Sequence, residues 1–225
     1  AIHQETETAV RALERVLDLL FPPKCPFCGR VMDRPGVCAG CASDLPWTEE
    51  ADSLRELPGA LRCAAPLWYE GVVREGLLRF KFQGAAGAAE PLGGLIAQCA
   101  AERLSGEFDT VTWVPVSRKR LRQRGYDQAE LLARSACRRW DTMPVRLLDK
   151  IRDNPAQSGL TDEAGRRENV RGVYRAAEDI RDRRILLVDD ICTTGATLCE
   201  CAGVLLSAGA AAVVCTAVAR TPFGE

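Results

Sequence analysis

The segment Ile185 to Leu198, which reads ILLVDDICTTGATL, constrains the fold of this chain more than any other feature. Its apolar run, Ile185 to Val188, shows no alternation of apolar and polar residues. Two carboxylates, Asp189 and Asp190, follow the run. Such a run is typical of a central parallel strand that is covered on both faces. Because ligands of open parallel sheets bind beyond the carboxyl ends of the strands, the segment predicts an α/β domain with a ligand site at this edge.

The turn after the acidic pair carries the residue types of a phosphate site. It consists of small and hydroxyl-bearing residues: Thr193, Thr194, Gly195, Ala196 and Thr197. A glycine here lets backbone amides approach an anion at the N-terminus of the next helix. The carboxylates would repel a bare phosphate, so they are better explained as acceptors for neutral donors such as ribose hydroxyls. Ribose 5-phosphate satisfies both requirements, and the alternative is an acidic strand end before an ordinary threonine-capped helix.

The stretch VDDICTTGATL resembles the signature by which type I phosphoribosyltransferases bind phosphoribosyl pyrophosphate, PRPP. It lacks the Gly-Lys-Ser/Thr ending of a nucleoside triphosphate loop and the GxGxxG of a dinucleotide fold. The resemblance implies that Asp189 and Asp190, the candidate catalytic residues, hold the 2′ and 3′ hydroxyls. Thr193 to Thr197 would then surround the 5′-phosphate, and magnesium would accompany the diphosphate.

Strand and helix patterns alternate over the rest of the chain. Strands are expected near 67–69, 110–116, 145–148, 184–190 and 211–219, and helices near 72–82, 89–104, 127–140 and 197–209. Parallel strands joined by crossover helices are the natural outcome. We therefore predict a phosphoribosyltransferase-like domain over 60–225, preceded by an acidic connector between Trp47 and Pro58.

A basic run follows the strand expected at 110–116. Five cations fall within seven residues: Arg118, Lys119, Arg120, Arg122 and Arg124. We predict a loop at the ligand edge that neutralises a diphosphate, with Arg118 and Lys119 as candidate binding residues. A solvated basic face and a contact to a nucleic acid backbone are the alternatives.

The polar segment 152–172 is a long connection of a kind that is usually functional or disordered. Members of the phosphoribosyltransferase family use such a segment as a flap. Four of its residues could then close over PRPP and exclude water, namely Gln157, Arg166, Arg167 and Asn169. A surface loop is the alternative.

Two CxxC turns, Cys25–Cys28 and Cys38–Cys41, stand nine residues apart in a stretch that has few large apolar groups. This spacing lets four thiolates surround one tetrahedral ion, and four sulfurs favour zinc. Iron or a pair of disulfides are the alternatives. We predict a zinc ribbon over 24–46, and an amphipathic helix before it over 1–23, stopped by Pro22 and Pro23. The other seven cysteines are interpreted as packing residues.

Overall charge does not select a partner, since the formal net charge is −1 and the pI is near 6.1. No stretch approaches the roughly 20 apolar residues of a membrane helix, and the first residues are acidic rather than basic. We therefore expect a cytoplasmic location without membrane insertion.

Three features together resemble the ComF family of competence proteins: the CxxC pair ahead of a Pro-Trp, the block RKRLRQRGYDQAELLA, and the pattern QSGL, RRENVRG and LLVDDICTTGATL. The resemblance implies a zinc ribbon followed by a type I phosphoribosyltransferase domain. It also implies a cytoplasmic role in DNA uptake and natural transformation, with incoming single-stranded DNA and uptake or recombination proteins as partners. Trp113 and Asp127 depart from the family pattern and could change how the basic loop binds diphosphate, so the resemblance supports PRPP binding more strongly than transferase turnover.

The sequence supports two classes of function. One is a transferase of nucleotide or amine metabolism, which displaces pyrophosphate from PRPP with a base or an amine. The other is a PRPP-binding accessory protein for DNA uptake, with little chemistry of its own. A duplex-binding regulator ranks last, because the N-terminal segment is acidic.

Overall fold

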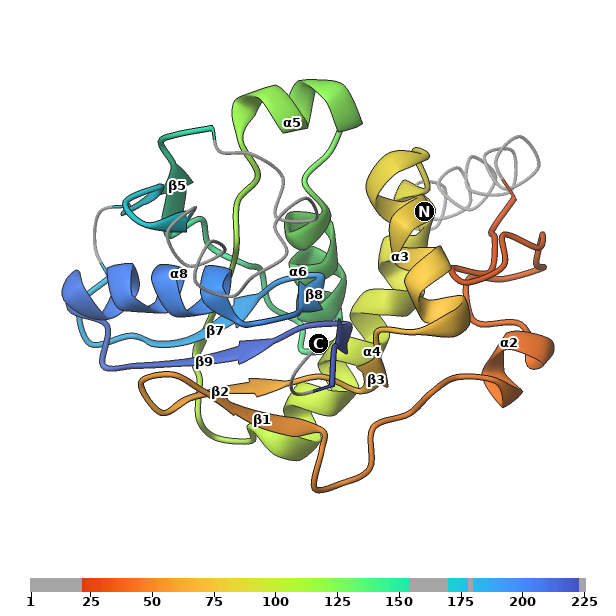
Figure 1. Cartoon of the computed structure of the whole chain (residues 1–225), viewed down its shortest axis with the longest axis horizontal. Coiled ribbons are helices and arrows are strands. Elements are labelled where there is room, and N and C mark those ends of the chain that lie inside the picture. The colour runs from red at the N-terminus through yellow and green to blue at the C-terminus, as the bar shows by residue number, and fades with distance from the viewer. Residues whose placement is uncertain (1–21, 154–169, 178–179, 223–225) are drawn as a thin grey trace, which may run out of the picture.

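The computed structural model describes residues 22–153, 170–177 and 180–222 (Figure 1). Apart from Pro22 and Pro23, the amphipathic helix expected over 1–23 lies outside the described residues. All four residues predicted for the flap also lie outside them.

A five-stranded sheet forms the centre of the molecule, in the order β1–β2–β9–β7–β4. The strands are β1 (Leu54–Leu57), β2 (Leu61–Ala64), β9 (Ala212–Thr216), β7 (Arg184–Val188) and β4 (Thr110–Trp113). All neighbouring pairs are parallel except β1 and β2, which form an antiparallel hairpin at one edge. The predicted parallel α/β architecture is confirmed.

Alternate residues of β7 pack into two different cores. Ile185 and Leu187 lie in the core beneath helix α8 (Ala196–Ser207), whereas Leu186 and Val188 lie in the core of the opposite face. All four side chains are fully buried. The absence of alternation in the sequence thus reflects a strand covered from both sides.

Helices α4 (Ala89–Arg103) and α6 (Gln128–Arg139) cover this opposite face and pack on each other (Figure 1). They approach so closely that a Cβ added at Gly93 would lie 2.4 Å from the Cβ of Ser135. The Ser135 hydroxyl donates to the Glu90 carbonyl at 3.1 Å, which joins the two helices at this point.

Two small sheets lie outside the central sheet. One is parallel and contains β3 (Leu67–Trp68), β10 (Ala219–Arg220) and β8 (Ile191–Cys192). The other is an antiparallel pair of β5 (Leu148–Lys150) and β6 (Tyr174–Ala176). The strand expected at 211–219 is therefore divided between two sheets, and β5 begins where the strand expected at 145–148 was to end.

The four-cysteine region packs on helix α3 (Gly71–Phe82) and shares a core with the main domain. Its short helix α2 (Ala39–Ser43) follows Cys38. Phe27 is 1% exposed, and a Cβ at Gly76 would lie 2.6 Å from the carbonyl oxygen of Pro26. The absence of a side chain at Gly76 lets this region dock against α3.

Two segments differ from the sequence-based interpretation. The basic run forms a helix, α5 (Arg118–Arg124), rather than a loop, because Ser117 accepts a hydrogen bond from the Arg120 amide and Gly125 ends the helix in the left-handed region. The connector contains β1, so the sheet begins at Leu54, before residue 60. The η1 turn (Ala86–Ala88) joins α3 to α4.

Candidate functional site

The four ligand atoms predicted to hold a metal come together in the structure. The Sγ atoms of Cys25, Cys28, Cys38 and Cys41 all lie within 4.8 Å of one another. The Sγ of Cys28 and that of Cys38 are 3.6 Å apart. Sulfurs that share a tetrahedral zinc with Zn–S bonds of about 2.3 Å would be about 3.8 Å apart, so the cluster has the right size for zinc.

Backbone amides orient these sulfurs. The amide of Cys38 points to the Sγ of Cys25 at 3.5 Å, and the amide of Cys41 points to the Sγ of Cys38 at 3.4 Å. Amide donors of this kind fix the orientation of metal ligands and favour the thiolate form. Three of the four cysteines are buried. The donor set and its surroundings fit a structural zinc site with no open position.

The acidic pair lies at the end of β7, at the floor of a cleft of about 570 Å³. The Nζ of Lys81, from the end of α3, is 3.0 Å from Oδ2 of Asp190. Asp189 accepts a hydrogen bond from the Asp190 amide at 2.8 Å. Burial, followed by the charge of Asp190, raises the pKa of Asp189 well above its usual range. Lys81 balances the charge of one carboxylate, and the pair presents oxygens to the cleft that can accept hydrogen bonds from two hydroxyls.

The phosphate-type turn is held in place by β1. Nη1 of Arg55 donates to the carbonyl of Thr193 at 2.7 Å. Gly195 has a φ of 77°, and a Cβ there would lie 2.6 Å from Cδ2 of Leu57. Thr193, Gly195, Ala196 and Thr197 line the cleft, whereas Thr194 accepts from the Ala196 amide with its hydroxyl. The turn thus presents backbone and small side chains to the same cavity as the acidic pair.

The cations that line the cleft differ from the two that the sequence predicts as diphosphate-binding residues. Arg120 and Arg124, one helical turn apart on α5, are half-buried and line it, and so do Lys81 and Lys150. Arg118 and Lys119 are exposed on α5 and do not line it, and the Nζ of Lys119 is 3.9 Å from Oδ2 of Asp153. Neighbouring residues of a loop are equivalent in this respect, whereas the helix divides the cations between two faces.

Lys150 is a residue of this cleft that sequence reasoning did not identify. It lies on β5, with its Nζ 5.3 Å from the centre of the Tyr174 ring. Burial, with a smaller contribution from the charge of Arg120, lowers the pKa of Lys150 to about 8. Its ammonium group therefore titrates close to neutral pH, and an anion in the cleft would favour the charged form.

Asp127 and Trp113, the two departures from the family pattern, have structural roles. The Asp127 carboxylate accepts from the amides of Val116 and Glu130, which ties the strand end to the start of α6. Burial raises the pKa of Asp127 to about 6. Trp113 is buried in the core under α6 rather than in the cleft.

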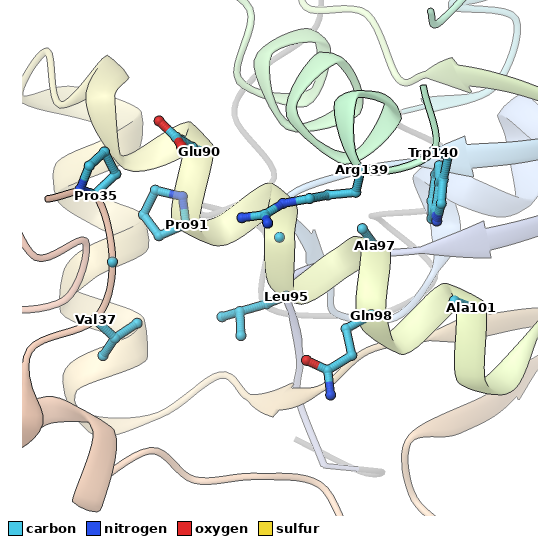
Figure 2. Close-up of a pocket in the computed structure, with 12 residues that line it drawn as sticks. Pro35, Val37, Glu90, Pro91, Leu95, Ala97, Gln98, Ala101, Arg139 and Trp140 are labelled. Carbon is cyan, nitrogen blue, oxygen red and sulfur yellow. The ribbon is translucent and has the colours of Figure 1, made fainter. Parts of the chain in front are cut away.

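A second cavity, of about 480 Å³, lies between the ribbon segment 35–37, α4 and the end of α6 (Figure 2). Its walls are mostly apolar, and its charged lining residues are Glu90 and Arg139. The Arg139 side chain extends over α4, where a Cβ at Gly94 would lie 3.4 Å from it. This second cavity lacks the carboxylate pair and the cations of the first cleft, and its lining residues do not suggest a reaction.

Comparisons with known proteins agree with this two-part architecture. A family model described as a phosphoribosyl transferase domain matches residues 121–224, and one described as a double zinc ribbon domain matches residues 16–52. Competence protein ComFC of Bacillus subtilis is 30% identical over 196 residues, which cover 84% of this chain and 74% of that protein. The chain belongs to the ComF family.

Other ComF-family matches are shorter. The DNA utilization protein YhgH of Escherichia coli K12 is 32% identical over 117 residues, and competence protein F of Haemophilus influenzae is 32% identical over 112 residues. These alignments cover 50% of the chain and of YhgH, and 48% of the chain and of competence protein F. The chain thus spans about half the length of the first curated relatives that it matches. Family membership fixes the fold class and the zinc ribbon.

Proposed function

We propose that this chain binds PRPP together with magnesium in the cleft at the end of β7. The observation that carries the proposal is the joint placement of the acidic pair and the phosphate-type turn in one cavity. Asp190 and Asp189 would accept the ribose hydroxyls, and the turn from Thr193 to Thr197 would surround the 5′-phosphate.

The cations of the cleft would hold the diphosphate. Arg120, Arg124 and Lys150 line the cavity on the side of α5 and β5, and Lys81 stands beside Asp190. Carboxylate and phosphate oxygens are the ligands that magnesium prefers, so the acidic pair and the diphosphate fit this ion. Magnesium would neutralise charge on the diphosphate. Arg118 and Lys119, our first candidates for this role, are better suited to an extended polyanion at the surface.

Calorimetry with PRPP and magnesium tests the proposal. We expect Asp190→Ala to weaken PRPP binding at least tenfold, because hydrogen bonds to a charged acceptor contribute about 1.5–3 kcal/mol. The control is Asp33→Ala, which removes an exposed carboxylate that does not line the cleft. Equal affinity of the wild type and Asp190→Ala for PRPP would contradict the assignment.

In biological terms we propose a cytoplasmic protein that supports DNA uptake by handling incoming single-stranded DNA. The names of its relatives in Bacillus subtilis and Haemophilus influenzae, which are competence proteins, support this role. In the described part of the chain, no helix has the length and apolar character required to cross a membrane. The exposed cations of α5 provide the basic surface that a phosphate backbone requires.

Binding of labelled single-stranded DNA at increasing salt tests this role. We expect affinity to fall steeply with salt, and the slope to become shallower when Arg118, Lys119 and Arg122 are replaced together by alanine. The absence of binding at low salt would favour the transferase or an adaptor that contacts only proteins.

A further inference from the structure

Two thiols that the proposed function does not use meet behind the phosphate-type turn. Cys63 lies on β2 of the central sheet and Cys192 on β8 of the small parallel sheet, and each is 1% exposed. The thiol of Cys63 donates a hydrogen bond to the sulfur of Cys192. The segment 217–218 joins the two stretches of chain, because its amides donate to the carbonyls of Ala64 and Asp190 at 3.0 and 3.1 Å. The backbone thus keeps the two sulfurs in contact.

A second link between the same two stretches comes from Arg55. This residue is the cross-strand neighbour of Cys63 in the hairpin of β1 and β2. Its Nη1 donates at 2.7 Å to the carbonyl of Thr193, the residue after Cys192. The hydrogen bond from Cys63, together with the charges of Arg55 and Arg220, lowers the pKa of the partner thiol, although burial opposes the shift. Surroundings of this positive character are typical of reactive cysteines.

The cleft at the end of β7 gives access to one of the two thiols. Of the cysteines in the described part of the chain, Cys192 alone lines this cleft, between the acidic pair and the phosphate-type turn. Cys63 does not line it, and neither does Cys215, its neighbour on β9. Both of these lie in the core beneath α8. A small reagent that enters the cleft therefore meets Cys192 first, and a second thiol lies in contact with that residue.

We propose that Cys192 and Cys63 form a peroxide-reactive thiol pair whose oxidation closes a disulfide behind the phosphate-type turn. The sulfur of Cys192 attacks one oxygen of hydrogen peroxide and the O–O bond breaks. The thiol proton leaves with the released oxygen as water, and Cys192 becomes a sulfenic acid. The sulfur of Cys63 then attacks this sulfenic sulfur. The S–S bond forms, the S–O bond breaks, and the Cys63 proton leaves with the oxygen as a second water.

The balance of the reaction is two thiols and one peroxide to one disulfide and two waters. Access decides the order of the two steps, since the cleft reaches Cys192 and not Cys63. A ligand that fills the cleft should cover Cys192 and slow the first step. Only this protective effect rests on the proposed function, because PRPP is the ligand that we place between the acidic pair and the turn.

Peptide mapping after peroxide treatment tests the pair in the zinc-loaded full chain. Trypsin separates Cys63 in the peptide 63–74 from Cys192 in the peptide 185–220. We expect peroxide to join these two peptides in the wild type, and dithiothreitol to release them. Cys192→Ala should abolish the link, whereas Cys215→Ala, which removes a neighbouring buried thiol, should keep it. A wild type that forms no link between the two peptides, or a link that fragmentation assigns to Cys215, would overturn the proposal.

The order of the two steps is tested with dimedone, which traps sulfenic acids. Cys63→Ala lacks the second thiol, so we expect the sulfenic acid to accumulate and the label to appear on Cys192. Cys192→Ala should carry no label on Cys63, which the cleft does not reach. The opposite pattern of labelling would refute the order. Zinc content and melting temperature show that each variant is folded, and the wild-type link gives a test that depends on no variant.

Oxidation in the presence of PRPP and magnesium separates this inference from the proposed function. At PRPP concentrations of about ten times its Kd, we expect the link to form about tenfold more slowly, because about one cleft in ten is then empty. An unchanged rate in protein that calorimetry shows to bind PRPP would exclude the cleft as the route of the peroxide. A protein that forms the link and does not bind PRPP would retain the thiol pair and lose the PRPP site. The converse result would retain only the PRPP site.

Discussion

The four-cysteine cluster and the acidic pair both bring together groups that repel one another when ionised, but different partners offset that repulsion. At the cluster, four thiolates need a metal ion, and all four come from residues 25–41. At the acidic pair, the balancing charge is Lys81 from α3, and the adjoining turn is held by Arg55 from β1. The cluster is therefore local and depends on a metal, whereas the cleft is assembled from distant parts of the chain.

This difference predicts that loss of the metal has the largest effect on the stability of the protein. We expect wild-type protein to carry about one zinc ion per chain, and Cys38→Ser to lose it along with a large part of the roughly 10 kcal/mol that such ions contribute. Phe27 packs against α3, so the damage should spread into the main domain and lower its melting temperature. Metal analysis and thermal unfolding measure the two effects.

The matched control is Cys99→Ser, which makes the same substitution at a buried cysteine of α4 outside the cluster. This variant should lose stability only through the altered packing around residue 99, and it should keep its zinc. A Cys38→Ser protein that is free of metal and well folded would show that the ribbon does not depend on the ion.

A second prediction concerns the turn, where tertiary contact should add to backbone strain. Gly195→Ala places a Cβ 2.6 Å from the Leu57 side chain at a φ of 77°. Left-handed backbone costs about 1–2 kcal/mol for a residue with a Cβ. We expect a loss of stability of about 2–4 kcal/mol, in which crowding adds to this strain, and PRPP affinity at least tenfold lower. Denaturant unfolding and calorimetry measure these effects.

Gly84→Ala separates the two contributions. Gly84 has a φ of 69°, and nothing lies within 4 Å of a Cβ placed there. It should show only the backbone cost and normal PRPP binding. Equal destabilisation by the two substitutions would mean that the contact between β1 and the turn contributes little.

The smallest expected effect is the pH dependence of PRPP binding through Lys150, whose pKa burial lowers to about 8. A bound diphosphate favours the charged ammonium and so raises this pKa. PRPP affinity should therefore be constant below about pH 8 and fall by up to about tenfold per pH unit above it. Lys150→Arg, which stays protonated, should flatten the dependence between pH 7 and 9. An unchanged dependence in the variant would exclude Lys150 as its source.

Several features could be predicted because their physical cause lies within a few residues. The buried strand with its acidic end and the two CxxC turns are examples, and the structure brings the cysteines together as the spacing predicts. The helices predicted near 72–82, 89–104 and 127–140 are confirmed. They could be predicted because apolar residues recur along each of them at helical spacing. Family membership also agrees with the resemblance seen in the motifs.

Other features could not be predicted because their cause is distant in sequence. The contact of Lys81 with Asp190 joins residues more than a hundred positions apart, and so does that of Arg55 with Thr193. The division of the basic run into a cleft-facing side and an exposed side required its helical state, which Ser117 and Gly125 set. One local signal was missed, since a serine before the run and a glycine after it are the usual caps of a helix.

The sequence alone determined the chemistry that this protein can carry: a thiolate cluster, a phosphate-type turn and an acidic pair. Periodicity, capping residues and metal-ligand spacing act over short distances, so they can be read from neighbouring residues. Only the tertiary structure decided which cations share the cleft with Asp189 and Asp190, and that Phe82 and Gln128 also line it. Those positions depend on how helices and strands far apart in the chain pack around two cores, and no local pattern encodes that packing.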